Sequence, residues 1–348
     1  MSKLNINFYQ FQEILNLKLG CYYPVKKLMT KNEILSVLKF YRFNNKFFPM
    51  PIFLDIDQKQ KKNIENQKRI ILYYKKNKFG LLTNFSIFSL EKKKLLKLFF
   101  KTKNLSHPGV KNFLSTKPFF ISGNIKLHKK IIFDKKHYPN YWKKFFRKKK
   151  ITKVGSFHTR NVPHKTHEWL IQNIQKKCKN ILIQPMTGRL KKGDFKSDIV
   201  RHAYTIFRKR NKNKNIFLTE FKSHARYAGP REASFHALVR KNFGCSHFFV
   251  GRDHAGVKNF YKKYESQIFC KKNQKKIGIK ILNFKEPGYC KKCKKVTGTG
   301  DNCSHSNKLK KYLSGTEIRR MIRLKRKIPE YYVSKEIAQI LSKKSLRN

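Results

Sequence analysis

Short apolar segments alternate with longer, helix-sized stretches between residues 150 and 250, and this alternation limits the folds open to the chain. The apolar segments have the length of buried strands, while the stretches between them have room for about three or four helical turns. Strands and helices that alternate in this way form a parallel sheet with helices on both faces. The predicted strands are Ile151–Phe157, Ile181–Gln184, Ile216–Glu220 and Ser246–Val250, and the predicted helices are Pro163–Lys177, Phe195–Lys209 and Pro230–Asn242.

The regions on either side of this alternation have different patterns. Before it lie short apolar runs separated by turn signals, such as Pro51–Asp55, Arg69–Tyr74 and Phe79–Leu82, which predict mostly β structure with a few helices. After it comes a Cys-rich loop, followed by the helix-like stretches Gly315–Lys325 and Pro329–Lys343. We therefore expect three parts: a β-rich domain over residues 1–135, an α/β domain over 136–285, and a small C-terminal part over 286–348.

The charge of the chain is extreme, with 83 Lys and Arg residues against 19 Asp and Glu, or a formal +64. Basic surfaces release counterions from phosphates, so a nucleic-acid-binding protein is one interpretation. The lysines, however, are spread along the whole chain and accompany many Asn, Ile and Phe residues, all encoded by A/T-rich codons. We favour compositional bias and do not expect nucleic acid as a partner.

No apolar run reaches the roughly 20 residues that span a bilayer, and the N-terminal residues do not form a signal-peptide pattern. We expect a cytoplasmic protein without a membrane partner.

The segment VGSFHTRNVPHKTHEWL, residues 154–170, combines several anion-binding side chains at the turn from a strand to a helix. Two histidines three apart lie on one helix face, close to free N–H groups and the positive end of the helix dipole. An arginine adds a planar fork, and Thr and Asn add neutral donors. Chance can also produce an H-x-x-H pair, but the whole set suits the holding of a nucleotide triphosphate while a second anion attacks it. The candidate residues are Thr159, Arg160, Asn161, His164 and His167.

A second segment, VGRDHAG at residues 250–256, follows another predicted strand. Its glycines allow tight turns and the close approach of a ligand. Arg252 and His254 add anion donors, while we expect Asp253 to order the loop. No G-x-x-x-x-G-K-[ST] motif is present, so the chain has no P-loop kinase domain.

Four segments resemble, in order, motifs of the ATP sulfurylase (sulfate adenylyltransferase) family. They are HTRNVPHKTH at 158–167, GPREA at 229–233, GRDHAG at 251–256 and SGTEIRRMI at 314–322, and CYYPVKKLMTKNEILSVL at 21–38 and HPGVKNFL at 107–114 are also similar to the family's N-terminal part. The resemblance covers nearly the whole chain. It implies a PUA-like N-terminal domain, a doubly wound α/β nucleotidyltransferase domain and a zinc-bearing C-terminal part. Members are commonly oligomeric, so a homo-oligomer is a candidate assembly.

The resemblance also implies the reaction of Mg²⁺-bound ATP with sulfate to give adenylyl sulfate (APS) and pyrophosphate. In the forward direction, which serves sulfate assimilation, sulfate attacks the α-phosphorus in line. In sulfur oxidation the reaction runs in reverse. By position, Thr159, Arg160, Asn161, His164 and His167 take the catalytic places. ATP binding is assigned to His158, Thr159, Arg160, Asn161, Gly251, Arg252, Asp253 and His254, and sulfate binding to His158, Arg160 and the backbone N–H of Ala255.

The chain departs from the family pattern at two positions. His158 stands where the family usually has Gln, a sulfate contact, and Gln184 stands where it usually has His. A neutral imidazole has one donor and gains a second on protonation, so oxyanion selectivity or pH dependence is expected to differ. A drifted, low-activity sulfurylase and a basic nucleic-acid-binding protein that reuses the fold are the alternatives.

Cys290, Cys293, Cys303 and His305 form a C-x₂-C-x₉-C-x-H pattern. Two short ligand pairs separated by a polar loop are typical of tetrahedral zinc, and four protein ligands leave no open position for catalysis. An odd total of seven cysteines, three of them clustered, also favours a metal over disulfides. We predict a structural zinc site, with reduced, unbound thiols as the alternative.

Overall fold

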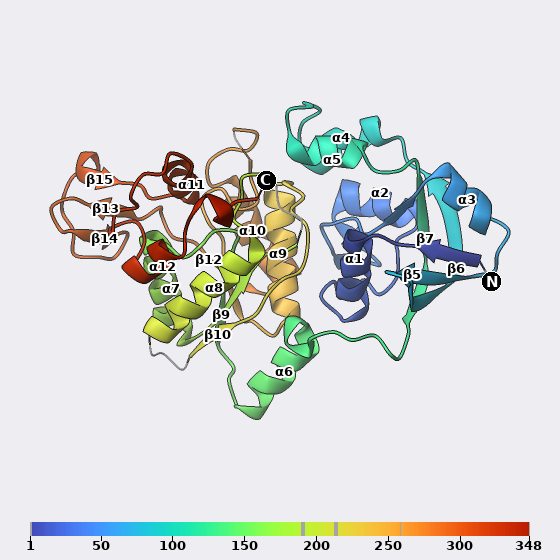
Figure 1. Ribbon diagram of the computed structural model, residues 1–348, viewed down its shortest axis with the longest axis horizontal. Helices are drawn as coiled ribbons and strands as arrows, with labels where there is room; N and C mark the ends of the chain where they lie inside the picture. The colour runs from blue at the N-terminus through green and yellow to red at the C-terminus, as the bar shows by residue number, and fades with distance from the viewer. Residues whose placement is uncertain (1, 189–191, 212–214, 258, 348) are drawn as a thin grey trace. The chain divides into compact units, whose positions relative to one another are not determined.

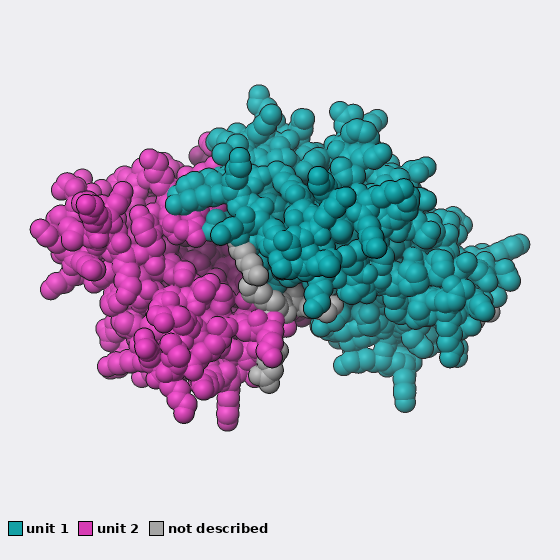
Figure 2. Space-filling view, turned by 90° about the horizontal axis from the view of Figure 1, so that it is seen from above, with its two compact units in different colours: residues 1–149, 225–244, 253–279 teal, residues 150–224, 245–252, 280–348 magenta. Residues whose placement is uncertain are grey.

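The computed structural model describes residues 2–188, 192–211, 215–257 and 259–347. The chain divides into two compact units, coloured separately in Figure 2. Unit 1 comprises residues 1–149, 225–244 and 253–279, and unit 2 comprises residues 150–224, 245–252 and 280–348. Within the described residues, none of the helices has both the length and the apolar character needed to span a membrane.

Unit 1 is built on a five-stranded sheet with the order β1-β5-β6-β7-β4 (Figure 1). Strand β1 is parallel to β5, and the other neighbours are antiparallel. The strands are β1 Ser2–Asn5, β4 Leu54–Ile56, β5 Arg69–Tyr74, β6 Asn77–Ser89 and β7 Phe119–Leu127, with a separate pair, β2 Arg42–Phe43 and β3 Lys46–Phe47. The helices are α1 Phe8–Lys18, α2 Lys31–Phe40, α3 Gln58–Ile64, α4 Lys92–Phe100, α5 Pro108–Leu114, α6 Pro139–Lys148, α9 Pro230–Asn242 and α10 Glu265–Ile277.

A buried arginine in the first turn of α9 joins the helices of unit 1. Arg231 is 3% exposed, and its guanidinium lies 4.0 Å from the ring of Tyr41. Its terminal nitrogens donate over 2.7–3.0 Å to the backbone carbonyls of Val37, Leu38, Pro49 and Leu98. Three of these carbonyls lie in the last turns of α2 and α4, where the helix dipole favours a cation, and the Val37 carbonyl also accepts from the N–H of Tyr41. Arg231 therefore closes the ends of two helices at once.

The next residue, Glu232, fixes the chain that leads into α9. Its carboxylate accepts from the backbone N–H groups of Arg226 and Ala228 over 2.9 and 3.0 Å. The Arg226 side chain in turn pairs with Glu13 at 2.6 Å. The GPREA segment thus forms part of the scaffold of unit 1.

Unit 2 contains a parallel five-stranded sheet with the order β10-β9-β8-β11-β12 (Figure 1). This is the order of a doubly wound sheet, which reverses between the first and fourth strands, here β8 and β11. The strands are β8 Val154–Thr159, β9 Asn180–Pro185, β10 Ile216–Leu218, β11 His247–Phe249 and β12 Lys280–Leu282. The helices of the unit are α7 Lys165–Cys178, α8 Ser197–Arg210, α11 Gly315–Arg323 and α12 Lys335–Gln339, and a small antiparallel sheet contains β13 Gly288–Cys290, β14 Lys295–Thr297 and β15 Lys310–Lys311.

Two boundaries in unit 2 differ from the sequence prediction for physical reasons. Strand β8 ends at Thr159, two residues later than predicted, because its ladder with β9 continues to Pro185. The predicted helix Pro329–Lys343 is reduced to α12. The carbonyl of Tyr332 accepts from the N–H of Lys165 instead of continuing a helix, and α12 begins only after Ser334, its N-cap residue.

Helix α7 packs closely on β8, because the strand has a glycine at the contact. A Cβ at Gly155 would stand 2.3 Å from the side chain of Ile174. Ile174 belongs to the buried core of the unit, which also contains Phe157 and Phe249. The close packing sets the position of the N-terminal end of α7, where the histidine pair lies.

Replacing Arg231 with Met should destabilise the protein. The substitution keeps much of the volume but removes the guanidinium from four backbone carbonyls. The Val37 carbonyl keeps the N–H of Tyr41 as a donor, and we expect the free energy of unfolding to fall by about 3 kcal/mol. Urea titration followed by circular dichroism measures this change. Arg42→Met, at an exposed position of β2, is the matched control and should stay within about 0.5 kcal/mol of the native protein. Equal midpoints for the two variants would contradict the role of Arg231.

Candidate functional site

The candidate site begins at the carboxyl ends of β8 and β11, which pair in parallel where the strand order reverses. Ligands of doubly wound sheets bind in the crevice outside the strands at such a point. Thr159 is the last residue of β8, and Gly251 follows β11 by two residues. The structure therefore places the beginnings of both predicted segments at the same edge of one sheet.

A tight turn holds the Thr-Arg-Asn triplet. The N–H of Asn161 donates to Oγ1 of Thr159 over 3.0 Å, and the carbonyl of Thr159 accepts from the N–H of Met186 over 2.9 Å. Thr159 is buried, and its hydroxyl lies 3.4 Å from the Asn161 carbonyl. The hydroxyl of Thr159 therefore shapes the loop that presents the next two side chains.

The side chain of Asn161 lies against helix α11. Nη1 of Arg319 donates to Oδ1 of Asn161 over 2.8 Å. A Cβ at Gly315, the first residue of α11, would stand 2.4 Å from Cγ of Asn161. The glycine of the SGT segment thus leaves the space that Asn161 occupies.

A single buried carboxylate lies between two arginines of the site. Oδ1 of Asp194 is 3.2 Å from Nη1 of Arg319, and its Oδ2 is 3.9 Å from Nη1 of Arg160. The Asp194 side chain is 2% exposed and that of Arg160 is 27% exposed. At 3.9 Å the contact with Arg160 is electrostatic and too long for a hydrogen bond. It orients a guanidinium whose several N–H groups can also bind an incoming anion.

The predicted histidine pair stacks at the start of α7. His164 is the N-cap residue and is 3% exposed, and its ring centroid lies 3.8 Å from that of His167 with 28° between the planes. The hydroxyl of Tyr204 lies 3.2 Å from Nδ1 of His167. Burial lowers the pKa of His164 to about 3, and burial together with the neighbouring His164 holds the pKa of His167 well below its usual range. Both rings are neutral near pH 7, so each has one N–H to donate.

The start of α7 offers fewer free backbone N–H groups than the sequence predicts. The N–H of Lys165, the first residue of the helix, donates to the carbonyl of Tyr332 over 2.8 Å. This N–H group is therefore not available to a bound anion.

His158, the residue that departs from the family pattern, has one ring nitrogen committed to the sheet. Its Nδ1 lies 3.1 Å from the backbone carbonyl of Gln184, its partner in the β8–β9 register. A carbonyl only accepts hydrogen bonds, so Nδ1 carries the proton. In the neutral ring Nε2 is then an acceptor, and it becomes a donor only when the imidazole is protonated.

Arg252 pairs with a carboxylate within unit 2. Its Nη1 donates to both oxygens of Glu286, at 2.7 and 2.6 Å. The sequence predicts Arg252 as an anion donor, and the structure shows that Glu286 already offsets part of its charge.

The rest of this loop belongs to unit 1. The N–H of Gly256 donates to the carbonyl of Asp253 over 3.1 Å, which closes a turn, and Ala255 has a left-handed backbone with φ of 57°. Nε2 of His254 lies 3.1 Å from Nδ1 of His236. Asp253, whose side chain is exposed, orders the turn through its backbone.

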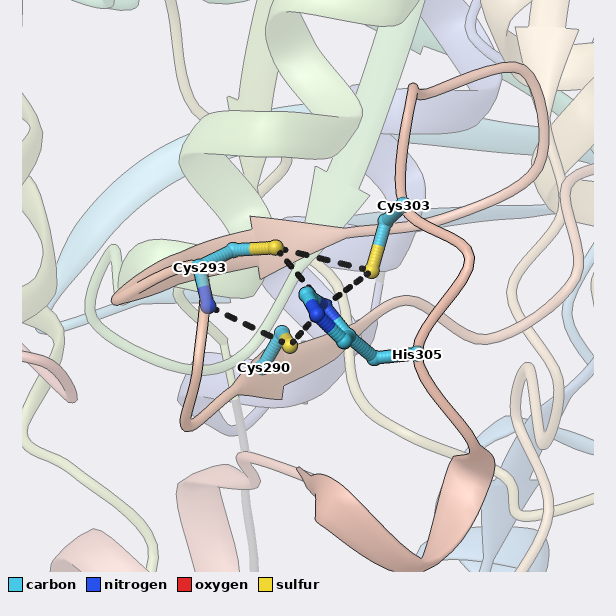
Figure 3. A group of neighbouring side chains, drawn as sticks. All are labelled: Cys290, Cys293, Cys303 and His305. Atoms are coloured by element: carbon cyan, nitrogen blue, oxygen red, sulfur yellow. Dashed lines mark hydrogen bonds between the residues drawn. The ribbon is translucent and has the colours of Figure 1, made fainter.

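Figure 3 shows the side chains of Cys290, Cys293, Cys303 and His305 converging on one point. The sulfurs of Cys293 and Cys303 are 3.7 Å apart, and Nδ1 of His305 lies 3.5, 3.2 and 3.8 Å from the three sulfurs in chain order. Zinc with bonds of about 2.3 Å to sulfur and about 2.0–2.1 Å to nitrogen needs tetrahedron edges of about 3.8 Å and about 3.6 Å. The four groups therefore fit a zinc ion in number, chemistry and spacing.

The loop of this cluster is tied to helix α7. Nε1 of Trp169 donates to Oδ2 of Asp301 over 2.5 Å, and the same oxygen accepts from the N–H of Gly298 over 2.8 Å. A Cβ at Gly298 would stand 2.6 Å from the Trp169 ring. The cysteine loop thus closes over the helix that begins with the histidine pair.

Sequence reasoning missed the residues that support the site from elsewhere in the chain. Asp194 and Arg319 lie 34 or more positions from the residues they orient. The only sequence signal for Asp194 is that it is a carboxylate in a strongly basic segment. The other supporting residues that the prediction did not include are Tyr204, His236, Glu286, Asp301 and Gly315.

Comparison with known proteins gives a consistent result. The sequence model of the family described as ATP-sulfurylase matches residues 134–344, and that of a PUA-like domain matches residues 1–130. The chain is 34% identical over 335 residues to a sulfate adenylyltransferase of Ignicoccus hospitalis, covering 94% of this chain and 87% of that protein. It is 33% identical over 352 residues to a sulfate adenylyltransferase of Pyrococcus abyssi, covering 97% of this chain and 89% of that protein.

Among solved structures, the chain is similar in fold to one described as a hexameric APS kinase from Thiobacillus denitrificans, with a TM-score of 0.75 and 17% sequence identity. The match covers 97% of this chain but 62% of the longer one.

The neutral histidine pair predicts a pH dependence of stability. The imidazole of His164 has a pKa near 6.5 in the unfolded chain and about 3 in the folded protein. As the pH falls, the unfolded chain therefore takes up this proton before the folded protein does. The contribution of the neutral imidazole to the free energy of unfolding is therefore complete above about pH 6.5. It is lost as the pH falls, by up to about 1.4 kcal/mol per pH unit. Urea titrations between about pH 6.5 and about pH 4.5 should show a shallower loss for His164→Gln than for the native protein. His202→Gln, at an exposed position of α8, should keep the native slope, and identical slopes in all three proteins would contradict burial of a neutral His164.

Proposed function

The chain belongs to the ATP-sulfurylase family, and we propose that it is a sulfate adenylyltransferase, which makes adenylyl sulfate and pyrophosphate from ATP and sulfate. The observation that carries the proposal is the arrangement at the end of β8. There Arg160 and Asn161 lie on a turn held by Thr159, and the neutral rings of His164 and His167 stack directly after it. This is an anion site with donors of different kinds and no general base.

The proposed reaction is a direct transfer between two anions. A sulfate oxygen forms a bond to the α-phosphorus of ATP while the bond from that phosphorus to the bridging oxygen of pyrophosphate breaks, and pyrophosphate leaves with the electron pair. No proton has to move. The demand on the protein is to align the two anions and offset their repulsion, for which positioned donors are the effective means.

Each side chain has a role that follows from its donors. Arg160 offers N–H groups in the plane of an oxyanion, and Asn161 offers its amide NH₂ beside it. The neutral imidazole of His164 can give one hydrogen bond to the phosphate oxygens that gain charge as pyrophosphate leaves. His167, whose Nδ1 already faces the hydroxyl of Tyr204, is proposed to line the same place. Gly251, Arg252, Asp253 and His254 are proposed to hold the nucleotide, and His158 and the N–H of Ala255 to contact sulfate. Mg²⁺ arrives with ATP as part of the substrate.

The same donors stabilise the same transition state in either direction, so the site could make ATP from adenylyl sulfate and pyrophosphate as well. The division into parts at residues 135 and 285 also stays a proposal.

Release of pyrophosphate from MgATP by the purified protein should depend on sulfate. Arg160→Met should lower the rate by about 10²–10³, the cost of removing one oxyanion donor. Arg208→Met, at an exposed position of α8, is the matched control and should leave the rate unchanged. The absence of any sulfate-dependent pyrophosphate from well-folded native protein would refute the function.

His158 predicts a difference in pH dependence from a Gln-containing site. With Nδ1 committed to Gln184, His158 donates to sulfate only when protonated, whereas a Gln amide donates at any pH. The KM for sulfate of the native protein should therefore rise as the pH is raised and the imidazole loses its second proton, and that of His158→Gln should rise less. Parallel curves would contradict this account, and a large gain in rate at every pH would identify a drifted native site.

We also propose that Cys290, Cys293, Cys303 and His305 hold a structural zinc ion. The spacing of the four groups supports this, and a site with four protein ligands leaves no position for substrate. The ion would close the loop that contacts Trp169.

Removal of the zinc should be visible in the fluorescence of Trp169. Trp142→Phe leaves Trp169 as the sole tryptophan, buried at 6% exposure. A chelator should release one zinc per chain, measured by elemental analysis, and shift the emission to the red because the loop no longer covers the indole. Asp301→Ala in the same background should show the shifted emission before chelation. Zinc release without any change in emission would contradict the link to α7, and protein isolated without zinc would contradict the site itself.

A further inference from the structure

A hydrogen bond from Arg319 fixes the orientation of the Asn161 amide, because only the amide oxygen can accept it. Its Oδ1 accepts a hydrogen bond of 2.8 Å from Nη1 of Arg319. A guanidinium has only donors, so the group facing Arg319 must be the amide oxygen and cannot be the NH₂. The two donors of the NH₂ are consequently on the side turned away from Arg319.

Arg319 is itself fixed on several sides. Its guanidinium lies 3.2 Å from Oδ1 of Asp194 and 3.1 Å from Oγ1 of Thr316, and it packs 5.9 Å from the ring of Phe195. The side chain is 12% exposed and that of Asp194 is 2% exposed. A side chain held in this way has few alternative rotamers and gives its neighbour a defined direction.

The backbone of α11 is shaped to the same amide. A Cβ at Gly315 would stand 2.4–2.7 Å from Cγ, Oδ1 and Nδ2 of Asn161, closer than a Cβ approaches other atoms in folded proteins. The helix start and the guanidinium therefore contact two different sides of one side chain.

We propose that Arg319 is a positioning residue that orients the Asn161 amide, so that its NH₂ faces the oxyanion of the reaction. Arg319 acts through Asn161 and does not itself touch sulfate. This inference rests on the proposed function, because it assigns the NH₂ of Asn161 to an anion that sulfate or the transition state supplies.

A double-mutant cycle tests whether the effect of Arg319 passes through Asn161. Asn161→Ala and Arg319→Met should each lower kcat/KM for sulfate, by about 10² if the donor is lost as from an oxyanion hole. In the Asn161→Ala background, Arg319→Met should cost less than about threefold, because the group it orients is already absent. Multiplicative losses in the double variant would overturn the proposal.

Two further variants separate positioning from folding. Arg320→Met changes the neighbouring arginine, which is half exposed and pairs with Glu317 on the surface, and should leave kcat/KM within about twofold. Gly315→Ala leaves Arg319 and Asp194 in place but pushes on the amide, and should lower kcat/KM as Asn161→Ala does. Native activity in Gly315→Ala would overturn the proposal.

A spectroscopic readout does not require turnover. In protein labelled with ¹⁵N-asparagine, the side-chain NH₂ signals of Asn161 are identified by their loss in Asn161→Ala. They should lie apart from the solvent-exposed asparagine amides in the native protein, move when sulfate is added with ATP, and return toward the exposed position in Arg319→Met. Identical signals in the native protein and Arg319→Met would overturn the positioning. Oriented signals in a protein that releases no pyrophosphate would refute the proposed function alone.

Discussion

Buried carboxylates that face arginines are the constraint on which both units depend. Basic residues outnumber acidic ones 83 to 19, so few carboxylates are available to pair with arginines inside the fold. In unit 1, the partly buried Glu13 pairs with the buried Arg226, and in unit 2 the buried Asp194 lies between Arg319 and Arg160. Arginine suits these places because its planar fork reaches two acceptors at once. Loss of one partner would leave an uncompensated buried charge, at a cost of about 3–5 kcal/mol.

The same arrangement makes the candidate site suitable for anions. Asp194 lies 3.9 Å from Arg160 and closer to Arg319. It orients Arg160 at the end of the strand, while Arg319 donates to Asn161. The buried histidines add donors without adding charge, because burial keeps them neutral. A site of this kind offers positioned hydrogen bonds for charge that shifts during the reaction.

Local patterns predicted the local parts of this structure well. The boundaries of α9 agree with the prediction to the residue, because Pro230 at the first turn is a strong start signal. The clustering of Cys290, Cys293, Cys303 and His305 follows from ligands that are close in sequence. The order of motifs identified the family that the comparisons confirmed.

Contacts between distant segments could not be predicted in the same way. The bond from Arg319 to Asn161 joins residues 158 positions apart, and the commitment of His158 to Gln184 depends on the register of two strands. Strand β12 and helix α10 also escaped prediction, since a strand of three residues and a lysine-rich helix give weak periodic signals. The roles assigned to the individual site residues stay predictions.

The central claim is that sulfate attacks ATP directly in the site at the end of β8. Exchange of radiolabelled pyrophosphate into ATP, measured with and without sulfate, tests this claim most directly. The account predicts exchange that requires sulfate and is lost in Arg160→Met, because pyrophosphate can re-enter ATP only from adenylyl sulfate. Exchange in the absence of sulfate, or none in its presence, would contradict it.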